Sequence, residues 1–138
     1  MSEGEESGVR FGAVVKGAVV GGIASLIESW VVAMLFMSGT PKSQAETEAM
    51  AKALMSSQSY LLTDLVASLL CMAIGGYVAA CSAGRSGTLN GAVTGAVLML
   101  VVGAMAIMSP QSMPGWYIAA VFLLIIPVAA LGGKMRAV

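Results

Sequence analysis

The sequence contains no histidine and only two cysteines, Cys71 and Cys81. Imidazole and thiolate side chains are the usual ligands of zinc and haem, so these centres have almost no side chains to use here. The two cysteines are ten positions apart in one apolar run, which separates them by about 15 Å on a helix and excludes a disulfide between them. We therefore expect no metal site and no cofactor.

Charged residues are also scarce. Seven basic and seven acidic side chains make up 10% of the chain, and the net charge is zero, whereas soluble domains have roughly 25% charged residues. Without a basic surface, nucleic-acid binding is not expected. With 58% hydrophobic residues and a mean hydropathy of +0.90, the composition is that of a protein in a lipid bilayer. The length of 138 residues predicts a single membrane domain.

Four apolar stretches are long enough to cross a hydrocarbon core of about 30 Å, which takes roughly 20 residues as a helix. They are Phe11–Met37, Tyr60–Ala83, Thr88–Met108 and Trp116–Gly133. Lipid does not satisfy open backbone groups, and these stretches lack the alternation of barrel strands. The sequence predicts an all-α fold, a four-helix transmembrane bundle over residues 11–138.

A polar tail, residues 1–10, precedes the first span and is expected to be disordered. Its glutamates have the wrong sign for a secretory signal peptide, so we expect the first span to remain as an anchor. Basic residues near the span ends predict the orientation, because they favour the cytoplasmic side. Five of the seven lie on the side of both termini, which predicts cytoplasmic termini: Arg10, Lys16, Arg85, Lys134 and Arg136.

The first connection, from Ser38 to Ser59, is the only long one. Ser43 and Glu46 form an S-x-x-E capping box, which is typical of a helix start. Apolar residues at helical spacing follow it, among them Met50 and Leu54. We predict a short amphipathic helix lying on the outer face of the membrane. A solvated loop with some helical tendency is the alternative.

Three ionisable side chains interrupt the apolar spans: Lys16, Glu28 and Asp64. A charge at the centre of a membrane helix costs about 2.5 to 3.5 kcal/mol on insertion scales, so such residues are usually paired, hydrated or functional. Lys16 is close enough to the cytoplasmic boundary to extend its ammonium group to water. Glu28 and Asp64 are expected to share a crevice between the first two spans.

Two carboxylates in such a crevice cannot both remain charged without water or a cation. This predicts a proton- or cation-linked site, with four neutral hydroxyls as candidate oxygen donors: Ser25, Ser29, Thr63 and Ser68. The alternative is structural. Glu28 then stays neutral and hydrogen-bonds a Ser or Thr, while Asp64 lies near the headgroups or caps its helix.

Small residues recur along the spans at helical spacing, which lets helices approach closely in lipid. We expect six glycines to pack helices together, within a monomer or in a homo-oligomer: Gly17, Gly21, Gly75, Gly87, Gly91 and Gly95. A lining of small residues around a narrow pore is the alternative. The fourth span has a bulky run, Val121–Ile126, and is expected to face lipid most, with Trp116 and Tyr117 as an interfacial aromatic belt.

The segment Gly75–Arg85 reads G-G-Y-V-A-A-C-S-A-G-R and is followed by Asn90-Gly91-Ala92. It resembles the G-G-Y-x-A-A-x-x-A-G-R turn of small bacterial four-span membrane proteins, the uncharacterised YrzE-like group. The resemblance implies a multi-pass protein of the bacterial inner membrane. It supplies no catalytic residue.

These observations lead to two functional hypotheses. The first is an inner-membrane protein without catalytic activity, which acts as a helix-packing subunit of a larger membrane complex or as a homo-oligomer in the lipid bilayer. The second is a small proton- or cation-coupled channel or transporter that uses Glu28 and Asp64. An enzyme is not expected, because the sequence offers no nucleophile beside a base and no liganded metal.

Overall fold

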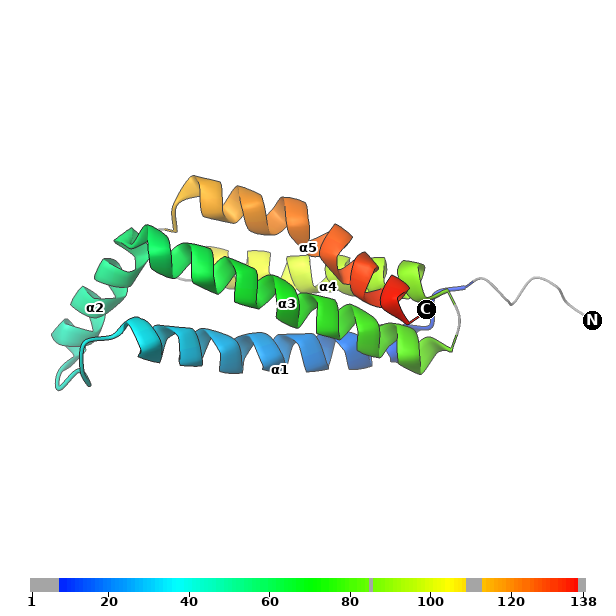
Figure 1. Cartoon of the computed structure of the whole chain (residues 1–138), viewed down its shortest axis with the longest axis horizontal. Helices are drawn as coiled ribbons and strands as arrows, with labels where there is room; N and C mark the ends of the chain where they lie inside the picture. Colours follow the sequence, from blue (N-terminus) through cyan, green and yellow to red (C-terminus); the bar gives the residue numbers. More distant parts are fainter. Residues whose placement is uncertain (1–7, 85, 109–112, 137–138) are drawn as a thin grey trace, which may run out of the picture.

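The computed structural model describes residues 8–84, 86–108 and 113–136. This part of the chain forms five helices and no strand (Figure 1). The helices are α1 (Phe11–Phe36), α2 (Gln44–Ser56), α3 (Gln58–Ala83), α4 (Gly87–Met108) and α5 (Gly115–Met135). Arg85, used above for the orientation, and residues 1–7 of the expected tail lie outside the described residues.

Four of the helices, α1, α3, α4 and α5, are long and apolar enough to cross a membrane. The prediction of an all-helical bundle with four apolar spans is therefore confirmed. The chain is a multi-pass membrane protein, and α1 begins at the same end of the bundle as α5 ends (Figure 1). We call this the terminal end and the opposite one the α2 end. The cytoplasmic side of the terminal end stays a prediction.

Helix α3 lies at the centre of the bundle and contacts all four other helices. In its most apolar stretch 33% of the residues are buried, against 28% for α5 and only 11% for α1. The expectation that the last span faces lipid most is therefore wrong, since α1 is the most exposed. Small residues on α5, including Ala129 and Gly133, bring that helix onto its neighbours.

The helices approach through glycine. A Cβ atom added at Gly17 of α1 would lie 2.5 Å from the carbonyl oxygen of Gly75 on α3. One at Gly133 of α5 would lie 2.2 Å from the carbonyl oxygen of Gly87 on α4. The other glycines named from the sequence also lie in contacts within this chain: Gly21 against Gly75, and both Gly91 and Gly95 against Ala129. At Gly17, Gly91 and Gly133 a backbone oxygen leaves no room for a side chain, whereas at Gly21 the nearest atom would be 3.2 Å from an added Cβ.

The first connection contains helix α2. Ser43 Oγ accepts a hydrogen bond from the Glu46 amide at 3.2 Å, and Glu46 Oε2 accepts one from the amide of Lys42 at 2.7 Å. The glutamate thus caps one residue earlier than in the standard box. None of the α2 residues is buried. Its position on the outer membrane surface stays a prediction.

Candidate intramembrane carboxylate site

Glu28 and Asp64 lie in the α2 half of the bundle. Glu28 is eight residues before the end of α1 and Asp64 six residues after the start of α3, so they are about 12 Å and 9 Å inside the helix ends at 1.5 Å per residue. Glu28 is hydrogen-bonded by Ser68 of α3, which is four residues, about one helical turn, after Asp64. The structure therefore brings together the two acids that the sequence singled out.

Each carboxylate is bound by one hydroxyl group from another helix. Ser68 Oγ of α3 donates to Glu28 Oε2 of α1 at 2.9 Å. The hydroxyl of Tyr117 on α5 donates to Asp64 Oδ2 of α3. Asp64 and Ser68 are four residues apart and lie on the same face of α3. The two hydrogen bonds therefore connect α1, α3 and α5 around the acids.

The second oxygen of each carboxylate is open, by which we mean buried and without a hydrogen-bond partner in the described chain. Asp64 is only 7% exposed and Glu28 is half-buried. Their Oδ1 and Oε1 atoms are buried, and so is the hydroxyl of Ser25; in the described part of the chain, none of these three atoms has a hydrogen-bond partner. A buried polar atom without a partner costs about 1–3 kcal/mol. The site therefore has capacity for a ligand that supplies a proton or a positive charge.

Tyr117 is the site residue that sequence reasoning missed, because we assigned it to an interfacial aromatic belt. It is 8% exposed and packs with Val32, Tyr60, Leu61 and Leu65. Its neighbour Trp116 is 44% exposed, with the two ring centroids 5.9 Å apart. Adjacent residues on a helix point about 100° apart, so both rings cannot share one face. A tyrosine hydroxyl that is buried needs a hydrogen-bond partner. The signal available in the sequence was therefore a tyrosine in an apolar span of a chain that also has two acids in its spans.

Ser68 and Thr63, two of the hydroxyl groups proposed from the sequence as oxygen donors, lie at different positions relative to the acids. Ser68 is at the site, whereas Thr63 is exposed and donates to the carbonyl oxygen of Ser59 at 2.8 Å. Thr63 therefore does not belong to the site. The N-terminal cap of α3 is Ser57, which accepts from the Tyr60 amide at 3.4 Å. Asp64 lies beyond this cap, in the interior of the bundle.

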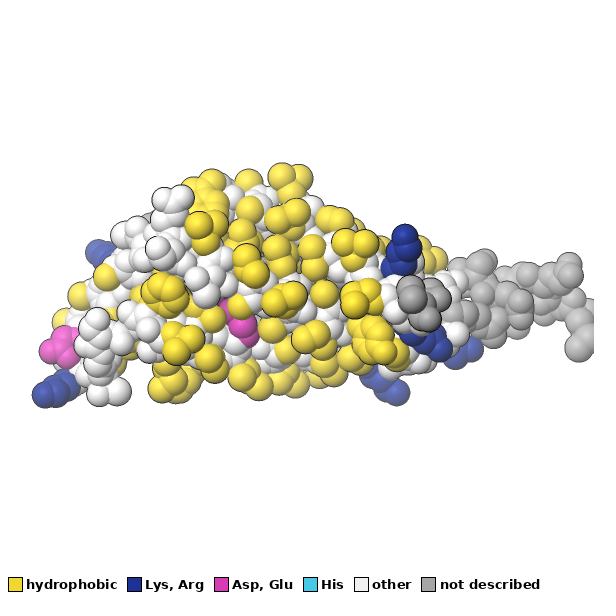
Figure 2. All heavy atoms as spheres, viewed as in Figure 1, with side chains coloured by type: hydrophobic (Ala, Val, Ile, Leu, Met, Phe, Trp, Pro, Cys, Tyr) yellow, Lys and Arg dark blue, Asp and Glu magenta, His cyan; other side chains and the backbone are white. Residues whose placement is uncertain are grey.

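The surface around the site is apolar. Figure 2 shows one group of acidic side-chain atoms at the α2 end and another in the middle of this face, over the region of α1 and α3, where hydrophobic side chains surround it. Exposed apolar residues of the two helices there include Ile27, Val31 and Leu70. Any ligand that enters from this side crosses an apolar surface.

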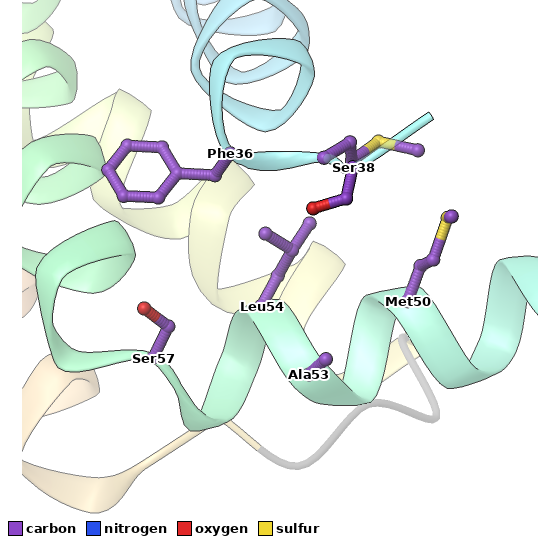
Figure 3. Close-up of a pocket in the computed structure, with 7 residues that line it drawn as sticks. Phe36, Ser38, Met50, Ala53, Leu54 and Ser57 are labelled. Atoms are coloured by element: carbon purple, nitrogen blue, oxygen red, sulfur yellow. The ribbon is translucent and has the colours of Figure 1, made fainter. Parts of the chain in front are cut away.

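A separate groove of about 290 Å³ lies where α2 meets the end of α1 (Figure 3). Its lining is mostly apolar: Phe36, Met37, Ser38, Met50, Ala53, Leu54 and Ser57. Neither carboxylate lines this groove. In residues 8–84, 86–108 and 113–136, no three His, Cys, Asp or Glu side chains gather as a metal site would require.

A second polar cluster, centred on Asn90, lies near the terminal end. Asn90 Oδ1 accepts from the Arg10 amide at 2.9 Å, and its Nδ2 donates to the carbonyl oxygen of Ser86 at 3.0 Å. Thr94 Oγ1 donates to the Asn90 carbonyl at 2.8 Å, and both side chains are fully buried. Asn90 thus fastens the start of α1 to α4. From the sequence, Asn90 was named only within the resemblance to the YrzE-like turn, although an amide in an apolar run itself indicates a buried polar contact.

No protein-family model matches this chain, and neither the curated proteins nor the solved structures provide a match. The function of this protein is therefore inferred from the residues of the site.

Proposed function

We propose that this membrane protein is a small transporter or channel whose Glu28–Asp64 pair binds and releases a proton or a small cation. The observation that carries the proposal is the pair of open, buried carboxylate oxygens, Glu28 Oε1 and Asp64 Oδ1. Acids in membrane spans are costly and commonly mark ion and proton pathways. A positive ligand would offset the negative charge of the carboxylates and give an open oxygen a partner.

The arrangement of the helices supports a coupling role. Glu28 is on α1, Asp64 on α3, and their hydroxyl partners are on α3 and α5. Binding or loss of a positive ligand changes the strength of both hydrogen bonds, because bonds to a charged acceptor are stronger than neutral ones. Ligand exchange would therefore shift the contacts among three spans. Such a link between occupancy and helix packing is what coupled transport requires.

Flux measurements in proteoliposomes test this proposal. We expect the wild-type chain to move protons or monovalent cations down an imposed gradient, and Glu28→Gln together with Asp64→Asn to reduce this flux at least tenfold. Glu46→Gln is the matched control, because it removes an exposed carboxylate of α2. Wild-type flux in the double variant would overturn the proposal.

A non-catalytic role as a membrane subunit or homo-oligomer is the second candidate. Helix α1 is the least buried of the four apolar helices, so it has the most surface available to another membrane helix. Phe11, Trp30 and Leu35 are 81%, 72% and 75% exposed on this helix. Because the glycines named above pack within the chain, an assembly would use the outer face of α1 instead. The mass of the complex in mild detergent tests this candidate. A monomeric wild-type chain without co-purifying subunits would contradict it. So would a complex whose mass Trp30→Ala leaves unchanged.

We also propose, from the sequence alone, that the membrane is a bacterial inner membrane and that the chain is related to the YrzE-like group. The support is the segment Gly75–Arg85, whose last residue lies outside the described residues. Localisation of a tagged chain in a bacterial host tests the membrane assignment. Recovery in the outer-membrane fraction would contradict it.

A further inference from the structure

We propose that the ligand of the carboxylate site is a proton and not a metal cation, and that Tyr117 positions Asp64 to take part in its binding. This inference deepens the proposed function and rests on its premise that the Glu28–Asp64 pair exchanges a positive ligand. It narrows the substrate class and adds a residue from α5 to the site.

The number of available oxygens favours the proton. Three buried side-chain oxygens are open: Ser25 Oγ, Glu28 Oε1 and Asp64 Oδ1. Hard metal cations need more, since Ca²⁺ takes six to eight oxygen ligands and Mg²⁺ takes six in octahedral geometry. A proton needs one oxygen to bond and one acceptor to receive the resulting hydrogen bond. The three open oxygens are sufficient for a proton. Ca²⁺ or Mg²⁺ would in addition need water or the hydrogen-bonded oxygens Glu28 Oε2 and Asp64 Oδ2.

The chemistry of the open atoms also fits a proton. When a carboxylate oxygen takes a proton from a hydronium ion, one O–H bond of the hydronium breaks, a water molecule is left, and an O–H bond forms on the carboxyl group. The negative charge of the carboxylate is neutralised, and the protonated oxygen becomes a hydrogen-bond donor. A serine hydroxyl both donates and accepts, so Ser25 can donate to a carboxylate and accept from a carboxylic acid. Hydroxyls of Ser68 and Tyr117 already bind the other oxygen of each acid. Protonation therefore changes the bonding at the open oxygens, and it weakens without removing the hydrogen bonds that Ser68 and Tyr117 donate to the other oxygens.

Tyr117 acts through Asp64. Its ring is held by an apolar cluster that includes Val32 of α1 and Leu65 of α3. Its hydroxyl occupies Asp64 Oδ2, which leaves Oδ1 as the open oxygen. The charged and titratable groups that act on this hydroxyl are Asp64 and Tyr60 of α3 and Glu28 of α1. Tyr117 is thus a positioning residue contributed by the last span.

Infrared difference spectroscopy of the full chain in lipid nanodiscs tests the ligand. A protonated carboxyl group has a C=O band that an ionised one lacks, and its frequency falls in D₂O. We expect a pH step to produce such a band, and Glu28→Gln or Asp64→Asn to remove or shift it, while Glu46→Gln leaves it unchanged. At constant pH and ionic strength, Na⁺, Mg²⁺ and Ca²⁺ should leave the band in place.

Two results would overturn the inference. One is loss of the band when a metal cation is added at constant pH, because this would show that the cation displaces the proton. The other is a spectrum in which no carboxyl band depends on Glu28 or Asp64. If flux is abolished in the double variant and a cation displaces the proton, the proposed function stands and this inference fails. If the carboxyl band of the protonated acid is present and no flux occurs, the assignment of the proton as ligand stands and the transport function fails.

Tyr117→Phe tests the positioning role, because it keeps the ring and removes the hydroxyl. A hydrogen bond to a charged group stabilises it, so we expect the site to bind its proton about tenfold more tightly without this donor. The Asp64 carboxyl band should also change frequency. Tyr77→Phe is the matched control, since it removes a hydroxyl from an exposed tyrosine of α3. The positioning role of Tyr117 would be contradicted if Tyr117→Phe left unchanged both the frequency of the Asp64 carboxyl band and the pH at which that band reaches half its intensity.

Discussion

The two buried polar clusters of this bundle differ in how completely they are bonded. At the terminal end, the Asn90 side chain uses its oxygen and its nitrogen in hydrogen bonds, and it is fully buried. Toward the α2 end, Asp64 is nearly as deeply buried, yet only one of its two oxygens has a partner in the described chain. A saturated neutral cluster stabilises a fold. A charged cluster with open oxygens is suited to exchange a ligand.

The packing around the two clusters differs in the same way. Near Asn90 the helices meet backbone to backbone, as at Gly87 and Gly133. Around Asp64 they meet through larger side chains, including Tyr60 and Tyr117. In Figure 1 the ribbons of α1, α3 and α5 draw together toward the terminal end. Side-chain contacts can rearrange with less disruption than backbone contacts, so we expect the terminal end to be the rigid half of the bundle.

The largest expected effect is on this rigid half. Gly133→Ala places a Cβ atom 2.2 Å from the carbonyl oxygen of Gly87, so α4 and α5 must separate. We expect a loss of about 3 kcal/mol in the free energy of unfolding, the upper range for overpacking. Reversible unfolding in mixed micelles measures it. Gly22→Ala is the control, because nothing lies within 4 Å of its added Cβ; equal losses in both variants would contradict the comparison.

The next effect concerns Asn90. Asn90→Ala leaves the Arg10 amide without its side-chain acceptor and removes a buried amide from α4. We expect a loss of about 2 kcal/mol in stability, since an unpaired buried group costs about 1–3 kcal/mol. Because no side chain in this cluster titrates, the loss should be the same at every pH that leaves the fold intact. A strongly pH-dependent loss would show that the two clusters are linked.

Asp64→Asn should affect stability less and transport more. The amide keeps the shape and an acceptor for Tyr117, and it removes a costly charge from the span. We expect the free energy of unfolding to change by no more than about 1 kcal/mol near neutral pH, as for exchange of one hydrogen bond for another. The same variant should lose most of its flux. A loss of stability as large as that of Asn90→Ala would make Asp64 a structural residue and remove the contrast between the clusters.

The sequence predicted the spans and the acid pair for clear physical reasons. A long apolar run has few alternatives in lipid, so the helix bounds agree within two residues. A carboxylate in such a run must find polar neighbours, which made Glu28 and Asp64 visible. The sequence did not show which face of each helix is buried, because this depends on how the helix packs against all of its neighbouring helices at once. Tyr117 was therefore placed in an interfacial aromatic belt, and α5 was expected to face lipid most.

The smallest expected effect separates two hydroxyls of α3 that the sequence treated alike. Ser68 donates to Glu28, whereas Thr63 donates to the backbone of its own helix and is exposed. Ser68→Ala removes one hydrogen bond to an acid and should cost about 1 kcal/mol, and Thr63→Ala should stay within about 0.5 kcal/mol, as surface changes do.

The infrared band distinguishes these two variants better than stability does. Loss of the Ser68 hydroxyl changes the surroundings of the Glu28 carboxyl group directly, so the frequency and pH midpoint of that band should move. Thr63→Ala should leave both where they are. If Thr63→Ala moves the band and Ser68→Ala does not, the polar face of α3 has been assigned to the wrong side of the helix. The open oxygens of Glu28 and Asp64 would then no longer define a common site.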